Sequence, residues 1–373
     1  MTTVIDRELR FERAGRLRWY DRQAPRVQEP TDALVRPFLA GRCDGDTLPI
    51  HRPVSRALQA GLALGLVDPV VGRICGSVPF RGPFPIGHEC VAEVVELGAE
   101  VTGLRIGQRV IVPWAVSCGS CPRCLRGLTS ACDRADGALA AFGFGPSCGP
   151  WGGMVADAVR VPHAAHMLVP IPPGVPAERV AAASDNLADA WRAVVPALSD
   201  RPDGSVLVIG GGARSIGLYA AGLAVANGAG VVDYVDRSAT RRKIAESLGA
   251  RVPARPEPPH RGYDVVVEAA STAAGLRLAL RSAAPGGVCT AVGYYFASGT
   301  RVPLMHMYAT DVTLHMGVSH VRAVLPELLE FVRRTGFPAE RVTTVTADWD
   351  DASTAYATRT TKLVLRRDPV SAG

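Results

Sequence analysis

The sequence lacks any uninterrupted apolar run of the roughly 18 residues that a membrane-spanning helix needs. Its first residues, Met1 to Glu8, carry both charges and lack the apolar core of a signal peptide. Lysine is scarce, since Lys243 and Lys362 are the two lysines among 41 basic residues. The arginines are scattered and form no basic patch or tail. We therefore expect a cytoplasmic protein with neither a membrane nor a nucleic acid as a partner.

The composition is that of a folded protein with more than one domain. The chain has 373 residues, and at roughly 100–200 residues per domain this length predicts two or three domains. Hydrophobic residues make up 47% of the chain and charged residues 20%, which excludes intrinsic disorder. The nine cysteines of a cytoplasmic chain are more often metal ligands or buried thiols than disulfides.

The pattern of strands and helices changes along the chain. The first 170 residues contain short β-like runs separated by glycine and proline, which predict an irregular, mostly β domain. After Val180 strand-like and helix-like segments alternate, and this alternation predicts a parallel sheet covered on both faces. The stretch 53–79 is compatible with helix or loop. The expected later elements are strands over Ser205–Ile209, Val231–Asp236, Asp264–Glu268 and Gly287–Gly293, a helix over Leu325–Arg334 and a final strand over Thr361–Leu365.

Four cysteines are concentrated in one short segment. Cys118, Cys121, Cys124 and Cys132 follow the spacing Cys-x-x-Cys-x-x-Cys-x7-Cys. Four thiolates on one loop suit a closed, tetrahedral zinc site, and such a site contributes on the order of 10 kcal/mol to the folding of its loop. The alternatives are an iron–sulfur cluster and unligated thiols. We predict a structural zinc ion here.

This spacing resembles the structural-zinc lobe of the zinc-dependent medium-chain alcohol dehydrogenases. The resemblance extends over nearly the whole chain, because Cys43-x-x-Asp46 and Gly87-His88-Glu89 are similar to that family's Cys-x-x-Asp and Gly-His-Glu motifs. It implies an α/β fold with a mostly β, GroES-like catalytic domain and a Rossmann domain, which is a doubly wound parallel sheet that binds the coenzyme. The implied division is 1–186 for the catalytic domain with its zinc lobe at 114–135, 187–320 for the coenzyme domain, and 321–373 for a return to the catalytic domain.

The resemblance also implies a catalytic zinc ion with three protein ligands and one open position. Cys43 and His88 lie in the matching motifs, and Asp185 lies where the family's third ligand is expected. The alternative role for Asp185 is an N-cap of the helix that follows it. We expect Asp46 and Glu89 to support the ligands, since a carboxylate that accepts the non-ligating N–H of His88 fixes its tautomer.

One position departs from the family pattern. Alcohol dehydrogenases of this family usually carry serine or threonine two residues after the first ligand, where the hydroxyl passes the substrate proton outward. Gly45 occupies that position and offers no hydroxyl. Asp44, Thr47, His51 or a water molecule are the candidate replacements. This departure argues against simple alcohol oxidation but leaves hydride transfer untouched.

A glycine-rich loop between an expected strand and an expected helix predicts a dinucleotide site. Counted from Gly210, its turn is two residues longer than the usual G-x-G-x-x-G. Asp236 ends the next strand and is placed to accept ribose hydroxyls, which favours NAD; Arg214 and Arg237 are the residues that would favour NADP. The resemblance directs Lys362 at the cofactor phosphates. The expected cofactor-binding residues are Gly210, Gly212, Arg214, Ser215, Ile216, Gly217, Asp236, Arg237 and Lys362.

Together these features predict a zinc-dependent oxidoreductase with two zinc ions per chain. It would transfer a hydride between NAD(H) and a small alcohol or carbonyl substrate, and the family implies a homodimer or homotetramer. The alternatives are an NAD(P)H-dependent reductase of an activated C=N or C=C bond, a zinc-dependent lyase or isomerase, and a non-catalytic nucleotide-binding protein. An aromatic of the segment Tyr294-Tyr295-Phe296 is a candidate to shape the substrate pocket.

Overall fold

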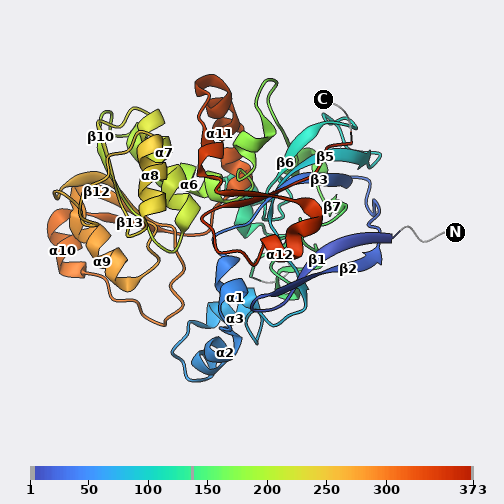
Figure 1. The fold of residues 1–373 in the computed structure, drawn as a ribbon, viewed down its shortest axis with the longest axis horizontal. Coiled ribbons are helices and arrows are strands. Elements are labelled where there is room, and N and C mark those ends of the chain that lie inside the picture. Colours follow the sequence, from blue (N-terminus) through green and yellow to red (C-terminus); the bar gives the residue numbers. More distant parts are fainter. Residues whose placement is uncertain (1–4, 136–137, 371–373) are drawn as a thin grey trace.

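The computed structural model describes residues 5–135 and 138–370, which form three sheets (Figure 1). A three-stranded antiparallel sheet has the order β2 (Arg16–Gln23), β1 (Ile5–Arg13), β4 (Phe84–Pro85). A seven-stranded sheet has the order β14 (Val345–Asp348), β15 (Leu363–Arg366), β3 (Ala33–Gly41), β5 (Glu89–Leu97), β6 (Arg109–Val112), β8 (Val169–Pro170), with β7 (Val159–Val161) paired to β3. The C-terminal strands β14 and β15 therefore share a sheet with strands from the first half of the chain.

The third sheet is parallel and has helices on both faces. Its order is β10 (Val231–Val235), β9 (Ser205–Ile209), β11 (Tyr263–Glu268), β12 (Ala283–Ala291), β13 (Thr313–Met316). Successive side chains of β9 point to opposite faces, so Val206 and Val208 join one core and Leu207 and Ile209 another. The surrounding helices are α6 (Asn186–Ser199), α7 (Arg214–Ala226), α8 (Ala239–Ser247), α9 (Ala273–Ser282), α10 (Leu304–Thr310) and α11 (Val321–Thr335).

Figure 1 places the parallel sheet and its helices on the left and the N-terminal strands on the right, with α6 and α11 between them. The core of α6 and α7 continues into α11, where the rings of Trp191 and Phe331 lie 5.0 Å apart. The chain then re-enters the seven-stranded sheet, because β15 pairs with β3. The expected α/β fold class, with a mostly β part and a parallel, doubly covered sheet, is confirmed.

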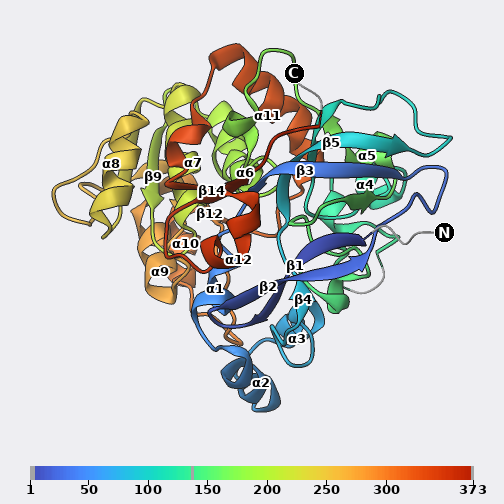
Figure 2. The same cartoon turned by 45° about the vertical axis from the view of Figure 1, so that its right-hand side comes forward.

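The stretch 53–79, which the sequence left open between helix and loop, is largely helical. It contains α2 (Ser55–Ala63) and α3 (Pro69–Cys75) after the short α1 (Thr47–His51), and Figure 2 shows α2 at the edge of the molecule. Asp68 is the N-cap of α3, since its carboxylate accepts the Val70 N–H at 2.9 Å and Pro69 occupies the first turn. The remaining short α-helices are α4 (Pro122–Leu125), α5 (Ala164–Met167) and α12 (Ala352–Ala355).

Candidate functional site

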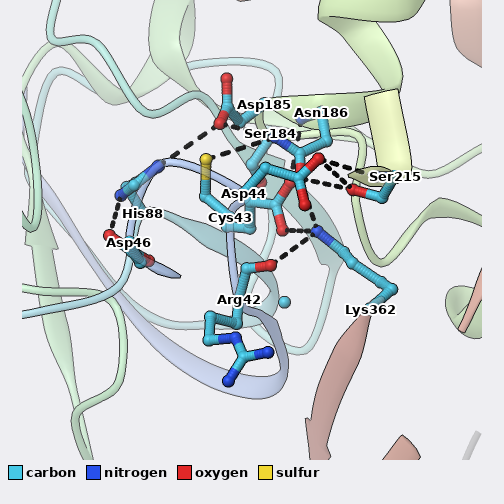
Figure 3. A network of polar contacts seen from close by, with 12 residues as sticks. Arg42, Cys43, Asp44, Asp46, His88, Ser184, Asp185, Asn186, Ser215 and Lys362 are labelled. Atoms are coloured by element: carbon cyan, nitrogen blue, oxygen red, sulfur yellow. Dashed lines mark hydrogen bonds and ion pairs between the residues drawn. The ribbon is translucent and has the colours of Figure 1, made fainter. Parts of the chain in front are cut away.

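Three predicted metal ligands meet at the junction of the two halves of the molecule. Cys43 follows β3, His88 precedes β5, and Asp185 precedes α6, so ends of three elements bring them together. One donor atom from each lies within 4.8 Å of the others, and Nε2 of His88 is 3.4 Å from Oδ2 of Asp185 (Figure 3). Cys43 and His88 are buried. The three side chains therefore bring one sulfur, one nitrogen and one oxygen atom close enough together to bind a single metal ion.

The donor set suits a zinc ion. Within the part of the chain that the structure describes, both ring nitrogens of His88 are buried without a hydrogen-bond partner. Burial and the neighbouring carboxylates of Asp185 and Asp46 raise the pKa of the Cys43 thiol well above its ordinary value. Although burial opposes a charged ring, those same carboxylates raise the pKa of His88 to about 9. Buried donors of this kind with unmet bonds are those that a divalent cation satisfies.

The two supporting carboxylates lie in different places. Oδ1 of Asp46 is 3.6 Å from Nδ1 of His88, on the opposite edge of the ring from Asp185. Glu89 points elsewhere, since it accepts the Asn186 N–H at 2.9 Å and pairs with the Lys362 ammonium. Asp46 therefore lies where the expected partner of His88 should be, whereas Glu89 belongs to a second, buried network.

Lys362 differs from its expected place at the cofactor phosphates. Its side chain is completely buried, and its ammonium donates to Glu89, to the Arg42 carbonyl at 3.1 Å and to Oδ1 of Asn186 at 2.9 Å (Figure 3). An ammonium enclosed by three acceptors is not available to a ligand in an open cleft. Lys362 instead holds a carboxylate beside the metal ligands.

Asn186 is a site residue that sequence reasoning missed. Its Nδ2 donates to Sγ of Cys43 at 3.3 Å and to Oδ2 of Asp185 at 3.1 Å. Its Oδ1 accepts from Lys362 and, at 2.9 Å, from the Ser215 hydroxyl. Asn186 thus connects two predicted ligands with the buried lysine and with α7. The available signal was its position directly after Asp185, at the first residue of a helix.

The four clustered cysteines also converge. One sulfur from each lies within 4.8 Å of the others, and all four side chains are buried. Gly119 has φ +76°, and its turn lets the chain wrap around the sulfurs. Sγ of Cys121 accepts the backbone N–H groups of Cys124 and Asp133, each at 3.4 Å. Four sulfurs with no open side are the donor set of a closed zinc site.

The glycine loop lines a cleft of about 800 Å³ that reaches Cys43 and Asp185. The expected long turn is wrong: the Gly210 N–H still bonds to Val235, and α7 begins at Arg214. The six residues from Gly212 to Gly217 therefore form the G-x-G-x-x-G frame, with Arg214 in place of the second glycine. A Cβ on Gly217 would lie 3.1 Å from the Ala269 Cβ, so this glycine allows α7 to approach the sheet closely.

A carboxylate of the chain itself occupies the N-terminus of α7. Oδ2 of Asp44 accepts the backbone N–H groups of Ser215 at 2.7 Å and Ile216 at 3.2 Å, and the Ser215 hydroxyl at 3.0 Å. Helix N-terminal N–H groups are where Rossmann folds bind a pyrophosphate. In this structure Ser215 and Ile216, which the sequence assigned to the cofactor, are bonded to Asp44 instead.

Arginines surround the same end of the cleft. Arg52, Arg214 and Arg359 all line it, and Arg214 donates to the Thr360 carbonyl at 3.0 Å. Burial and the nearby charges of Arg359 and Arg52 lower the pKa of Arg214. His51 lies among them, with both ring nitrogens buried and unpartnered among the described residues. Concentrated positive charge of this kind favours an anionic ligand.

Asp236 is buried and already engaged. Arg241 donates to it through Nε at 2.6 Å and Nη2 at 2.7 Å, and Tyr234 and the Ser238 N–H donate at 2.9 and 2.7 Å. A Cβ on Gly210 would lie 2.4 Å from the Asp236 carboxylate, so glycine is required there by packing. Arg237 is exposed, outside the residues that line the cleft.

An apolar pocket of about 160 Å³ opens from His88 toward α3. Its walls come from α1, α3, the segment 80–86 and the segment 294–296. The two cavities share the residues Gly45, Leu48, Ile74, Phe144, Tyr294, Tyr295 and Phe296. The cluster of Cys43, His88 and Asp185 therefore lies where the apolar pocket meets the larger cleft.

Comparison with known proteins agrees with this architecture. The family model of the alcohol dehydrogenase GroES-like domain matches residues 29–173, and that of the zinc-binding dehydrogenases matches residues 215–334. A protein named as a probable zinc-binding alcohol dehydrogenase of Mycobacterium tuberculosis is 33% identical and covers 76% of this chain and 73% of its own length. The alcohol dehydrogenase TADH from Thermus sp. ATN1 has 31% identity and a TM-score of 0.81, with 96% and 99% of the two chains covered.

Two more distant structures share the fold with different coenzymes. A Sinorhizobium meliloti 1021 protein assigned as a zinc-binding dehydrogenase is bound to NADP, with 22% identity, a TM-score of 0.75 and coverage of 98% of this chain and 100% of its own. An alcohol dehydrogenase from E. coli CFT073 is in complex with NADH, with 19% identity, a TM-score of 0.75 and coverage of 97% and 99%. The fold is thus compatible with either dinucleotide.

These matches define an oxidoreductase with a GroES-like and a Rossmann-type half. The chain belongs to the zinc-dependent medium-chain alcohol dehydrogenase family and is a zinc-dependent, NAD(P)-linked dehydrogenase/reductase. Members of this family act on small molecules. In the described residues no helix is both long enough and apolar enough to cross a membrane.

Proposed function

We propose that this enzyme transfers a hydride between NAD(H) and an apolar alcohol or its aldehyde or ketone, with zinc held by Cys43, His88 and Asp185. The observation that carries this proposal is the position of the cluster. His88 lines the apolar pocket, whereas Cys43 and Asp185 line the cleft that contains the glycine loop. A substrate carbon in the pocket and a nicotinamide in the cleft would meet at these three side chains.

When bound, zinc supplies Lewis acidity and the nicotinamide supplies or accepts the hydride. Cys43, His88 and Asp185 would hold the zinc ion, and a site with three protein ligands would leave one position for the substrate oxygen. Asn186 holds the Cys43 sulfur and the Asp185 carboxylate in place through its amide. The apolar walls contributed by Val71, Ile74 and their neighbours bind the carbon skeleton and exclude water.

A second zinc ion belongs to Cys118, Cys121, Cys124 and Cys132, where it stabilises the lobe. The support is the closed geometry of four buried sulfurs with N–H groups directed at one of them. No position faces a substrate in such a cage. Two zinc ions per chain follow from the two clusters.

The dinucleotide phosphates are held by Arg52, Arg214 and Arg359. Because Asp44 accepts the N–H groups at the start of α7, the usual anion site of a Rossmann fold is filled. The guanidinium groups of these three arginines line the same cleft and can replace it. Guanidinium forks bind phosphate oxygens in pairs. We keep Asp236 as the acceptor of the ribose hydroxyls, which favours NAD over NADP, and on this proposal the ribose replaces one of the four donors that Asp236 has in the structure.

The phosphate assignment is tested by measuring the dissociation constant of NADH by fluorescence titration. Arg52→Gln and Arg359→Gln are each expected to weaken NADH binding about tenfold, since each loses a charge-assisted hydrogen bond. Arg277→Gln, on the exposed side of α9, is the matched control and should leave the affinity unchanged. Unchanged affinity in both cleft variants would overturn the assignment.

Turnover is tested by a screen of apolar alcohols, aldehydes, ketones and imines with both dinucleotides. The readout is the change in nicotinamide absorbance. The proposal expects oxidation of apolar alcohols and reduction of the corresponding carbonyl compounds. Turnover confined to imines or activated C=C bonds would instead favour a specialised reductase. Substrate conversion with no net absorbance change would favour a lyase or isomerase.

The organisation of the whole protein is also a proposal. We keep the division into 1–186, 187–320 and 321–373, a homodimer or homotetramer, and a cytoplasmic location. The support for the division is that β1 to β8 and β9 to β13 form separate sheets. Light scattering after size-exclusion chromatography tests the oligomer, limited proteolysis the boundaries, and cell fractionation the location.

A further inference from the structure

The junction of the two cavities contains one hydroxyl group with no partner. Of the described residues that line both the apolar pocket and the cleft, Tyr294 and Tyr295 carry hydroxyls. The Tyr295 hydroxyl donates to Oε2 of Glu268 at 2.5 Å. The Tyr294 hydroxyl makes no hydrogen bond to any described residue, although the ring of Phe296 lies 6.0 Å from its own. Tyr294 is therefore free to bond to a ligand at this junction.

Tyr294 also fills the space above Gly45. A Cβ built on Gly45 would lie 3.1 Å from Cε2 of Tyr294, 3.2 Å from its hydroxyl oxygen and 3.6 Å from Sγ of Cys43. The phenol thus takes the volume that a side chain on residue 45 would take, directly beside a predicted zinc ligand. Gly45 has no positive φ, so its backbone does not require glycine. A side chain at this position would instead displace the Tyr294 phenol by a few tenths of an ångström.

We propose that Tyr294 is a catalytic residue, whose hydroxyl exchanges the proton of the substrate oxygen in place of a hydroxyl on residue 45. This inference rests on the proposed dehydrogenase function. In oxidation the alcohol O–H proton passes to the phenol oxygen while the phenol proton passes to water in the cleft. The carbon–hydrogen bond breaks, its two electrons and hydrogen leave as hydride to NAD⁺, and a C=O bond forms. Reduction is the reverse.

The route for the released proton is open on the polar side. Tyr294 is 55% exposed, and it lines the cleft together with Thr47 and His51. Water in that cleft would take up the released proton, and the same tyrosine also lines the apolar pocket. One side chain thus borders both cavities.

The first experiment measures binding without turnover. Cyclohexanecarboxamide, whose carbonyl oxygen mimics that of an aldehyde, is titrated by calorimetry into the zinc-loaded enzyme with NADH present. Tyr294→Phe is expected to weaken its binding about threefold to tenfold, the value of one lost hydrogen bond. Tyr308→Phe, on the exposed face of α10, is the matched control and should bind the amide as the wild type does. Equal affinity in Tyr294→Phe and the wild type would overturn the proposal.

The second experiment uses steady-state kinetics and rescue. Tyr294→Phe is expected to lose about 10²-fold in kcat with a smaller change in KM, because a proton-transferring group is missing. Tyr294→Ala should lose as much, and the double variant Gly45→Ser/Tyr294→Ala should recover at least about tenfold over it, since the removed ring leaves room for a serine hydroxyl. Zinc content and thermal stability are compared in all variants to show that each is folded.

The outcomes separate this inference from the proposed function. If the wild type turns over but Tyr294→Phe keeps its kcat, the dehydrogenase assignment stands and the role of Tyr294 is wrong. If the double variant is no faster than Tyr294→Ala, the two positions do not exchange a function and the proposal is likewise wrong. If the wild type neither turns over any screened substrate nor binds the amide, the proposed function itself fails.

Discussion

Replacement of Lys362 by methionine tests the buried network beneath the metal ligands. Glu89 and Lys362 are both completely buried and form an ion pair, and burial raises the pKa of Glu89 while the ammonium opposes that rise. Lys362→Met keeps the volume of the side chain but removes the ammonium that donates to the Glu89 carboxylate, the Asn186 amide oxygen and the Arg42 carbonyl. The buried Glu89 carboxylate then keeps the Asn186 N–H but has no cation beside it. Loss of one partner of a buried pair costs about 3–5 kcal/mol, so we expect a loss of unfolding free energy in that range.

The assay is urea denaturation of the zinc-loaded protein, followed by tryptophan fluorescence, in parallel with the dissociation constant of NADH. In Glu89→Gln/Lys362→Met no buried charge is left unpaired, so the double variant should recover a large part of the loss. A loss confined to about 0–1 kcal/mol, which is typical of an exposed pair, would contradict the network. Weaker NADH binding at unchanged stability would restore the expectation that Lys362 reaches the phosphates.

Three further predictions follow from the two metal clusters, the ribose site and the partly buried His166. Elemental analysis should find two zinc ions per chain. Cys121→Ser should lower thermal stability more than Cys43→Ser, whereas Cys43→Ser should abolish turnover with only a modest loss of stability. Equal loss of thermal stability in the two variants would contradict these roles. The wild type should prefer NAD over NADP by at least about tenfold in kcat/KM, and Asp236→Ser should narrow or reverse this preference. A wild type that prefers NADP would show that the role of Asp236 is wrong. Burial and the charge of Arg322 lower the pKa of His166 from 6.5 to about 4, so the folded state binds fewer protons than the unfolded chain in this window. The free energy of unfolding therefore decreases as pH falls from 6.5 to about 4. The expected decrease is about 1–2 kcal/mol, after allowance for solvent screening of the partly exposed ring. His166→Gln should flatten urea-unfolding free energies over the same pH window, and an unchanged slope would refute the assignment.

Local patterns predicted the α/β fold and the four-cysteine cluster, and the resemblance to the dehydrogenase family supplied the three ligands of the other cluster. The four cysteines share one loop, so their spacing is a local property of the chain. Cys43 and His88 lie in short motifs that flank strands, and Asp185 directly precedes a helix. Each signal is contained within a few residues. The structure brings all seven side chains together in two groups, as those patterns indicated.

Contacts between distant segments could not be predicted in this way. Lys362 and Glu89 are 273 residues apart, and Asp44 and Ser215 are 171 apart. A lysine on a closing strand is ordinarily expected at the surface, because burial of its charge is costly unless a partner is present. The stretch 53–79 was left open between helix and loop for another reason. The helices α2 and α3 are only nine and seven residues long and both contain glycine, so the local signal for a helix is weak.

Two unusual features of the cleft each have a counterpart on another segment of the chain. Gly45 lacks a hydroxyl, and the phenol of Tyr294 occupies the space that the missing side chain would take. Asp44 brings a negative charge to the N-terminus of α7, and Arg214 brings a positive one to the first residue of the same helix. Either change alone would remove a proton route or repel a pyrophosphate. Since each departure has a partner on another segment of the cleft, the site is better understood as a rearranged dehydrogenase centre than as a decayed one.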